Sequence, residues 1–213
     1  MGRWLFVLLA LVTGLVLPSG VEQGCLSARA AEECEASVEK NAPGLFVRRG
    51  HQLIVHLANG KSRTYRDVVP DEQHESQIIL YRFVRHYPEV GYGLIAADYY
   101  EGGGHYLLNL RTGAQVGTTG NPILSPDRVR FAVANADVEL HYRPNELKVY
   151  RIEPARLVVE FDAKPKDWGA EELKWRTNDE LFFTETRFDS KSLSAIDVSQ
   201  RSLRRRSGRW AIE

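Results

Sequence analysis

Two short stretches carry the side chains best suited to binding or chemistry. The first combines Asp98, Glu101 and His105 with Tyr99 and Tyr100 around three consecutive glycines. Carboxylates and an imidazole can ligate a metal, and aromatic rings beside a turn can contact a peptide or small molecule. The glycines are also typical of a hairpin turn, and they precede no helix that could bind phosphate. A structural turn is therefore favoured, a contact surface is the functional alternative, and a metal site ranks last.

The second stretch offers Asp137, Glu139, His141 and Tyr142 within six residues. It follows one predicted strand and precedes another, so it should form a loop. Loops between strands often carry binding residues because a rigid scaffold positions them. We therefore name these four residues, with the five of the first stretch, as candidate binding residues. The alternative is a solvated connection without a ligand.

No pattern in the chain predicts catalysis. The six histidines include no His-x-His or His-x-x-x-His pair of metal-ligand spacing. There is no Gly-x-Ser-x-Gly motif, and no serine or cysteine stands beside a histidine in a recognised setting. The sequence thus predicts no catalytic residue, no metal site and no cofactor. A small hydrolase that uses carboxylates or a histidine from the two loops remains the alternative.

The elements around the second stretch alternate in the manner of short strands. Ser125-Pro-Asp-Arg128 has turn chemistry, since proline presets φ and Asp127 can bond the backbone two residues on. Val129, Phe131 and Val133 then share one side of a strand, with Arg130 on the other. Two further strands are predicted over 147–152 and 157–161, joined by a tight turn. Such a unit of about 40 residues has the size of one β-propeller blade.

The unit recurs along the chain. Ile123, Ser125, Asp127, Val129 and Phe131 have counterparts 52 positions later (175 minus 123), at Trp175, Thr177, Asp179, Leu181 and Phe183. Residues 106–116 and 148–158 share the pattern strand, tight turn, strand. The sequence of this unit resembles WD40-like repeats of the TolB type, whose turn motif matches Ser125, Pro126, Asp127, Arg130, Phe131 and Ala132. Arg128 replaces the usual glycine, and no Gly-His or Trp-Asp signature occurs. The resemblance, which extends to exported bacterial proteins with such blades, implies a fold rather than a function.

Strand patterns continue over the rest of the chain, and only a short helix or frayed turn is predicted, over 32–40. We expect an all-β protein of antiparallel four-stranded blades, a small or partial propeller with about three blades and an N-terminal hairpin over 45–57. The hairpin could complete a sheet and close the ring, or the blades could remain an open, curled array; the closed form is slightly favoured because it would remove exposed edges. The blades should form a single domain over 31–213.

The first residues have the features of a secretory signal. Arg3 precedes an apolar run from Trp4 to Leu17, whose roughly 21 Å of helix would be too short for a hydrocarbon core of ~30 Å. We assign a signal peptide to residues 1–30, with cleavage between 20 and 30 and favoured after Ala30; an uncleaved anchor is the alternative. Depending on the cut, Cys34 is a lone thiol or can pair with Cys25. A lipid anchor on Cys25 is disfavoured because the preceding residues do not fit a lipobox.

The net charge of the chain gives no reason to expect nucleic acid as a partner. The chain has 28 basic and 28 acidic residues, so no global field steers it to nucleic acid. Five arginines between 201 and 209 form one basic cluster, interpreted as a solvated edge strand; contact with an anionic envelope component or an acidic partner is the alternative. We predict an exported, periplasmic binding or scaffold module that presents the two loops to another envelope or periplasmic protein, with no transmembrane helix after cleavage. A purely structural envelope protein is a further alternative.

Overall fold

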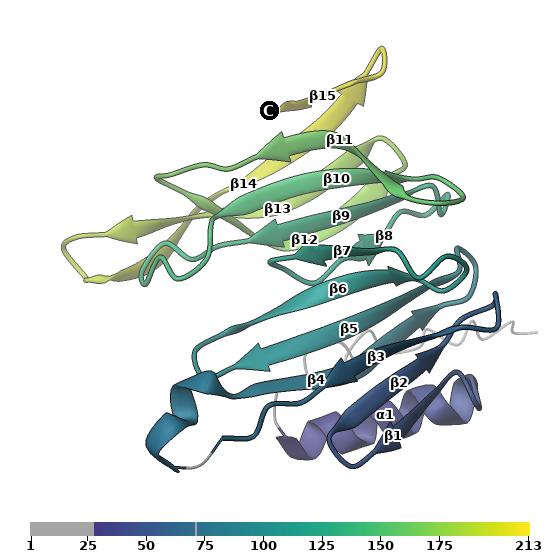
Figure 1. Ribbon diagram of the computed structural model, residues 1–213. Coiled ribbons are helices and arrows are strands. Elements are labelled where there is room, and N and C mark those ends of the chain that lie inside the picture. Colours follow the sequence, from purple (N-terminus) through teal and green to yellow (C-terminus); the bar gives the residue numbers. More distant parts are fainter. Residues whose placement is uncertain (1–27, 71) are drawn as a thin grey trace, which may run out of the picture.

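The computed structural model describes residues 28–70 and 72–213 and consists almost entirely of antiparallel strands (Figure 1). Its only helical elements in that range are α1 (Ala28–Asn41) and the 3-10 segment η3 (Glu72–Gln77). The predicted all-β class is confirmed. Most of the predicted targeting segment, with Cys25, lies outside the described residues. The predicted cut after Ala30 falls inside α1.

Four sheets follow one another along the chain, and each pairs its strands in sequence order. The first contains β1 (Phe46–Arg49), β2 (Gln52–His56) and β3 (Ser62–Arg66). The second contains β4 (Ile79–Tyr87), β5 (Tyr92–Tyr99), β6 (Gly103–Asn109) and β7 (Gln115–Thr118). The third contains β8 (Ile123–Leu124), β9 (Arg130–Asn135), β10 (Glu146–Ile152) and β11 (Leu157–Ala163). The fourth contains β12 (Gly169–Thr177), β13 (Glu180–Asp189), β14 (Ser194–Arg206) and β15 (Arg209–Ile212). Three four-stranded blades are thus confirmed, and the N-terminal hairpin is extended to three strands.

Apolar side chains fill the space between each pair of consecutive sheets. Leu53 and Phe83 belong to the cluster between the first and second sheets. Phe131 belongs to the cluster between the second and third, and Leu147 and Phe183 to that between the third and fourth. The third sheet is therefore covered on both faces, which explains why the first four consecutive residues of β9, Arg130 to Val133, are buried. The sequence pattern had indicated only one packed face for this strand.

The stack of sheets is open. The first sheet, with α1, lies at one end and β15 of the fourth sheet lies at the other (Figure 1). Of the two arrangements considered from the sequence, the open array is the one found, and the slightly favoured closed ring is wrong. The N-terminal strands form a sheet of their own that packs with α1 on the second sheet, through the cluster that includes Val38 and Phe46, and the fourth sheet already has four strands.

The exposed edge of β4 is capped by side chains instead of by ring closure. Glu35 of α1 accepts the Phe83 N–H at 3.0 Å, and Asp67 accepts the Tyr81 N–H at 2.8 Å. Arg48 donates to the Tyr81 carbonyl and pairs with both carboxylates, at 2.7 and 2.9 Å. These groups occupy the hydrogen-bonding positions that an added strand would need. The helix that supplies Glu35 has 14 residues and is longer than the predicted frayed turn.

The C-terminal arginines do not form a free basic edge. They lie on β14, an inner strand of its sheet, and on β15. Arg201 pairs with Glu185 at 2.8 Å and Arg205 pairs with Asp179 at 3.3 Å. Arg204 and Arg206 also pair with carboxylates, those of Glu180 and Glu213. The local sequence pattern does not reveal these carboxylate partners. The interpretation as a solvated edge strand is therefore wrong for the four arginines of β14.

The turn before β9 behaves as its residues predict. Arg128 N–H donates to the Ser125 carbonyl at 2.9 Å, and Asp127 accepts the Val129 N–H two residues on at 3.2 Å. Arg128 has a φ of 61°, the left-handed conformation that glycine adopts at the least cost.

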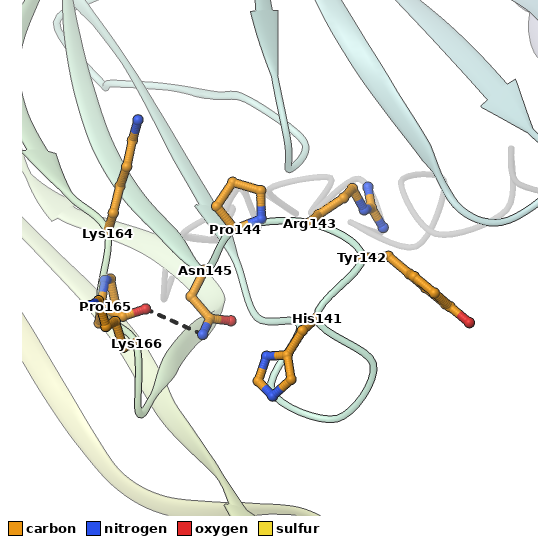
Figure 2. A pocket seen from close by; sticks show the side chains of 8 residues that line it. All are labelled: His141, Tyr142, Arg143, Pro144, Asn145, Lys164, Pro165 and Lys166. Carbon is orange, nitrogen blue, oxygen red and sulfur yellow. Dashed lines mark hydrogen bonds between the residues drawn. The ribbon is translucent and has the colours of Figure 1, made fainter.

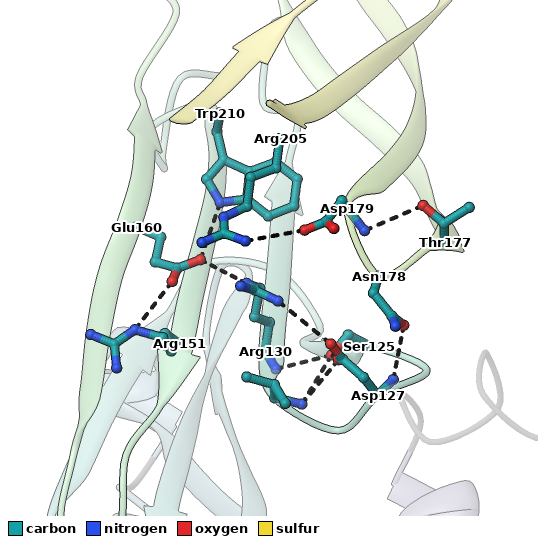
Figure 3. A network of polar contacts seen from close by, with 11 residues as sticks. Ser125, Asp127, Arg130, Arg151, Glu160, Thr177, Asn178, Asp179, Arg205 and Trp210 are labelled. Atoms are coloured by element: carbon teal, nitrogen blue, oxygen red, sulfur yellow. Dashed lines mark hydrogen bonds and ion pairs between the residues drawn. The ribbon is translucent and has the colours of Figure 1, made fainter. Parts of the chain in front are cut away.

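A polar network next to this turn joins the third and fourth sheets (Figure 3). Glu160 on β11 accepts hydrogen bonds from Arg130 at 2.7 Å and from the Trp210 indole at 3.2 Å. Burial acts to raise the pKa of Glu160, but these hydrogen bonds and the neighbouring Arg130 charge lower it overall. Trp210 also packs in the apolar cluster between the two sheets, together with Trp168 and Trp175. The network therefore serves sheet-to-sheet packing.

Candidate binding surface at the loop end

Connections from three successive sheets meet at one end of the stack. They are the β5–β6 turn (100–102), the β9–β10 loop (136–145) and the tip of the β13–β14 hairpin (190–193), which lie on the left of Figure 1. Arg143 of the loop donates to the Gly103 carbonyl and, at 3.0 Å, to the Thr119 carbonyl. Glu139 of the same loop accepts the Ala195 N–H at the start of β14. The structure thus brings the two predicted stretches together.

The β5–β6 turn is shorter than predicted. Gly103 and Gly104 belong to β6, and only Tyr100, Glu101 and Gly102 form the turn. Gly102 has a φ of +79°, and the Arg143 guanidinium lies over it, 3.7 Å from where a Cβ would stand. A Cβ on Gly103 would come within 2.9 Å of the Ala97 carbonyl oxygen. The prediction of a loop through Gly104 is therefore wrong, because the glycines allow close strand pairing and contact with Arg143.

Asp98 and His105 face the interface with the third sheet and not the solvent. Asp98 forms an ion pair with Arg82, whose side chain is almost fully buried. Burial raises the pKa of Asp98 even though the Arg82 charge opposes this. Burial, aided by the charges of Arg143 and Arg82, lowers the pKa of His105 to about 4. At neutral pH the imidazole is therefore uncharged, beside the two guanidinium groups.

Asp137 holds the β9–β10 loop in shape. Its carboxylate accepts the N–H groups of Arg143 at 2.7 Å, His141 at 3.0 Å and Leu140 at 3.3 Å. Burial acts to raise its pKa, but these backbone hydrogen bonds hold the pKa below its usual range. His141 sits in this tight loop with a φ of 54°. Asp137 therefore positions the residues around it and has little capacity left for a ligand.

A hollow of about 420 Å³ opens between the β9–β10 loop and the β11–β12 connection (Figure 2). Asn145 joins its two walls, since it accepts the Asp137 N–H at 2.7 Å and donates to the Pro165 carbonyl at 3.3 Å. The lining contains no acidic side chain, and we call the site the basic hollow. Its residues are His141, Tyr142, Arg143, Pro144, Asn145, Lys164, Pro165 and Lys166.

Large apolar and aromatic side chains are exposed around the same three connections, and we call this set the loop-end surface. Leu193 is 75% exposed, Leu140 62% and Tyr142 59%. The full set is Tyr99, Tyr100, Leu140, Tyr142, Phe188 and Leu193. Of the nine predicted binding residues, Tyr99, Tyr100 and Tyr142 belong to this surface, His141 and Tyr142 line the basic hollow, and Glu101 is exposed on the turn. Asp98, His105, Asp137 and Glu139 are engaged within or between elements.

Sequence reasoning missed Arg82, Arg143, Asn145, Lys164 and Lys166. Arg143 and Asn145 flank Pro144 directly after the predicted loop residues, so extending the candidate loop by three residues would have included them. The two lysines come from a different connection, and no local pattern relates them to the loop. Among the described residues, no group of three His, Cys, Asp or Glu side chains could hold a metal ion. No helix within the described range combines the length and apolar character needed to cross a membrane.

Comparison with known proteins does not place the chain in a family. No family model matches it, and no curated protein matches its sequence. A similar solved structure contains S. cerevisiae Dbp5 bound to Nup159, Gle1, IP6 and ADP. The similar chain is 10% identical with a TM-score of 0.36, and the match covers 79% of the present chain and 46% of the other. The present chain thus spans less than half of that chain, and the four antiparallel sheets are compatible with blades but establish no WD40-like or TolB family.

Proposed function

We propose that the protein is an exported binding module, and that the loop-end surface contacts another protein of the envelope or periplasm. The observation that carries the proposal is that exposed aromatic and apolar side chains from three successive sheets lie at the same end of the stack, around a β9–β10 loop whose backbone Asp137 fixes. Scattered exposed apolar residues are ordinary, but several at one end of a molecule suggest an interaction site. Tyrosine and other aromatic residues are enriched at the energetic centres of protein interfaces.

Preorganisation of the loops supports the same function. The carboxylate of Asp137 fixes the backbone of the β9–β10 loop, Glu139 joins that loop to β14, and Arg143 joins it to β6. A surface that is already ordered loses little conformational freedom when a partner binds. These bonds also occupy two of the carboxylates, those of Asp137 and Glu139, that the alternative hydrolase would use. Binding without catalysis is therefore the function favoured by the geometry.

Site-specific photocrosslinking in the cell tests this proposal. A photoreactive phenylalanine analogue is placed singly at Tyr100, Tyr142 and Leu193, and at Val129 as a control. Val129 is also exposed but lies before β9, at the opposite end of that strand from the loop. We expect all three loop-end positions to capture the same protein and Val129 to capture none. The added changes Leu140→Asp and Phe188→Asp should reduce that capture at least fivefold.

Two results would contradict the proposal. One is capture of the same species from Val129 as from the loop-end positions, which would indicate non-specific contact. The other is capture that persists unchanged in the doubly substituted protein. In either case the exposed side chains would not form the binding surface.

A further inference from the structure

The positive charge of the two lysines in the basic hollow is not neutralised by ion pairs within the described residues. Lys164 and Lys166 are exposed, and no ion pair joins either of them to a carboxylate in the described part of the chain. Lys148, by contrast, pairs with Glu146 and Asp162. Asp167 directly follows Lys166 but does not line the hollow. The lining of the hollow therefore combines Arg143 and two lysines with no acidic side chain, although the whole chain carries equal numbers of acidic and basic residues.

The walls of the hollow are fixed rather than adaptable. Asn145 is buried, and its amide group connects the β9–β10 loop to Pro165. Pro144 and Pro165 restrict the backbone on the two sides. Lys164 and Lys166 are both exposed, while Pro165 between them is half-buried. Both ammonium groups are therefore accessible to a ligand at the edge of the hollow that Figure 2 shows.

We propose that the basic hollow binds an extended acidic segment of the partner protein, with carboxylates at alternate positions. This inference rests on the proposed function and specifies the chemistry of the partner. Side chains on one side of an extended chain recur about every 6.6 Å, twice the rise of a strand residue. Lys164 and Lys166 are also two residues apart, so an Asp/Glu-x-Asp/Glu segment matches their spacing. Charge complementarity of this kind gives specificity and speeds association.

A peptide fits the surroundings better than an anionic saccharide does. Tyr142 belongs both to the basic hollow and to the loop-end surface, and Leu140 lies two residues before it. A bound peptide could place carboxylates on the lysines and apolar side chains against these residues. A sulphated or carboxylated saccharide would use the charge and leave the apolar side chains exposed. The hollow also falls within the roughly 300–1,000 Å³ typical of ligand sites.

The test measures fluorescence anisotropy of labelled eight-residue peptides on the purified chain at low ionic strength. The main probe alternates glutamate with leucine or tyrosine, and two controls carry glutamine for glutamate or the same glutamates in one block. Binding is compared among the unaltered chain, K164E/K166E and K40E/K61E. Lys40 ends α1 and Lys61 precedes β3, so the second variant makes the same change in net charge at the N-terminal part of the molecule. A sulphated saccharide serves as competitor.

We expect the alternating peptide to bind at least tenfold more tightly than the glutamine peptide and more tightly than the block peptide. K164E/K166E should weaken its binding at least tenfold, and K40E/K61E by less than twofold. Equal losses in both variants, or equal binding of the acidic and glutamine peptides, would overturn the inference. Competition by the saccharide at a lower concentration than unlabelled peptide would assign the site to saccharide instead. If the peptides fail but loop-end photocrosslinking succeeds, the proposed function stands and only the acidic partner is rejected.

Discussion

His105 shows how one position can be polar, internal and still adjacent to a binding surface. Its neighbours Arg82 and Arg143 come from β4 and from the β9–β10 loop, so the imidazole lies where the second and third sheets meet. The sequence could identify His105 as a candidate because of the carboxylates and tyrosines near it. It could not show that the ring would be buried beside two distant arginines, and this burial, aided by the two charges, lowers its pKa.

We predict that His105 makes the stability of the protein depend on pH between about 4 and 6.5. Its pKa is about 4 in the folded chain and near 6.5 when unfolded, so in this window the unfolded state binds more protons. Stability therefore rises with pH, and about 2 kcal/mol is lost as pH falls from 6.5 to 4. Urea unfolding of the unaltered chain and His105→Gln at several pH values measures the difference. The variant should lose less stability on acidification.

The matched control is His56→Gln, which alters an exposed histidine whose ring contacts only Ser62, at 3.2 Å. Comparing variants cancels the contribution of the carboxylates, which also titrate toward pH 4. Parallel stability curves for the unaltered chain and His105→Gln would contradict the burial of this ring between two arginines.

At the scale of elements, the position of the β9–β10 loop could be predicted from the sequence, but its conformation could not. Its position between two strands was predictable from alternation and from its polar, proline-containing composition. Its conformation depends on backbone N–H groups that converge on Asp137 and on contacts with Gly103 and Ala195. The types of the residues do not reveal that these N–H groups converge. Asp137 was therefore expected to bind a ligand, whereas its carboxylate binds the backbone of its own loop.

We predict that Asp137→Ala frees the loop while leaving the sheets folded. The change removes the carboxylate that accepts hydrogen bonds from three backbone N–H groups, which should cost about 1–3 kcal/mol and raise amide exchange locally. Hydrogen exchange measured by mass spectrometry should show faster exchange over 138–145 and little change in β13. Glu139→Ala is the informative companion, because it should affect the β13–β14 tip and the loop together. Unchanged exchange over 138–145 in Asp137→Ala would refute the structural role.

For the whole molecule, the number of blades was predictable and their closure was not. Periodicity and turns mark each strand, and the repeat at Phe131 and Phe183 marks buried positions of equivalent sheets. Closure depends on whether the N-terminal strands prefer the second sheet or the fourth. That choice is made by long-range contacts such as the stacked rings of Phe46 and Phe83, 5.1 Å apart, and by the Glu35 contact with β4.

We predict that Phe131→Ala weakens the whole stack. Phe131 is fully buried between the second and third sheets, and its ring lies edge-on to Tyr87 at 5.0 Å and Tyr92 at 5.7 Å. Removing a phenylalanine from such a site costs about 3–5 kcal/mol. Urea unfolding should report a loss of this size, whereas Val129→Ala, at an exposed neighbouring position, should change stability by less than about 0.5 kcal/mol. Similar losses in the two variants would show that Phe131 does not carry the interface.

The open stack also bears on how such a protein can change over evolutionary time. Each inner sheet contacts only the sheets before and after it, and neither end is committed to closing a ring, so length is not fixed by geometry. A sheet could be gained or lost at the fourth-sheet end while the packing of the earlier sheets is preserved. A closed propeller has no such freedom, since adding a blade alters the angle between all the others. Loss of the fourth sheet would uncover the apolar side chains that the third sheet turns toward it, such as Leu147 and Val149, so a shorter chain of this kind would need polar substitutions or a new cover on that face.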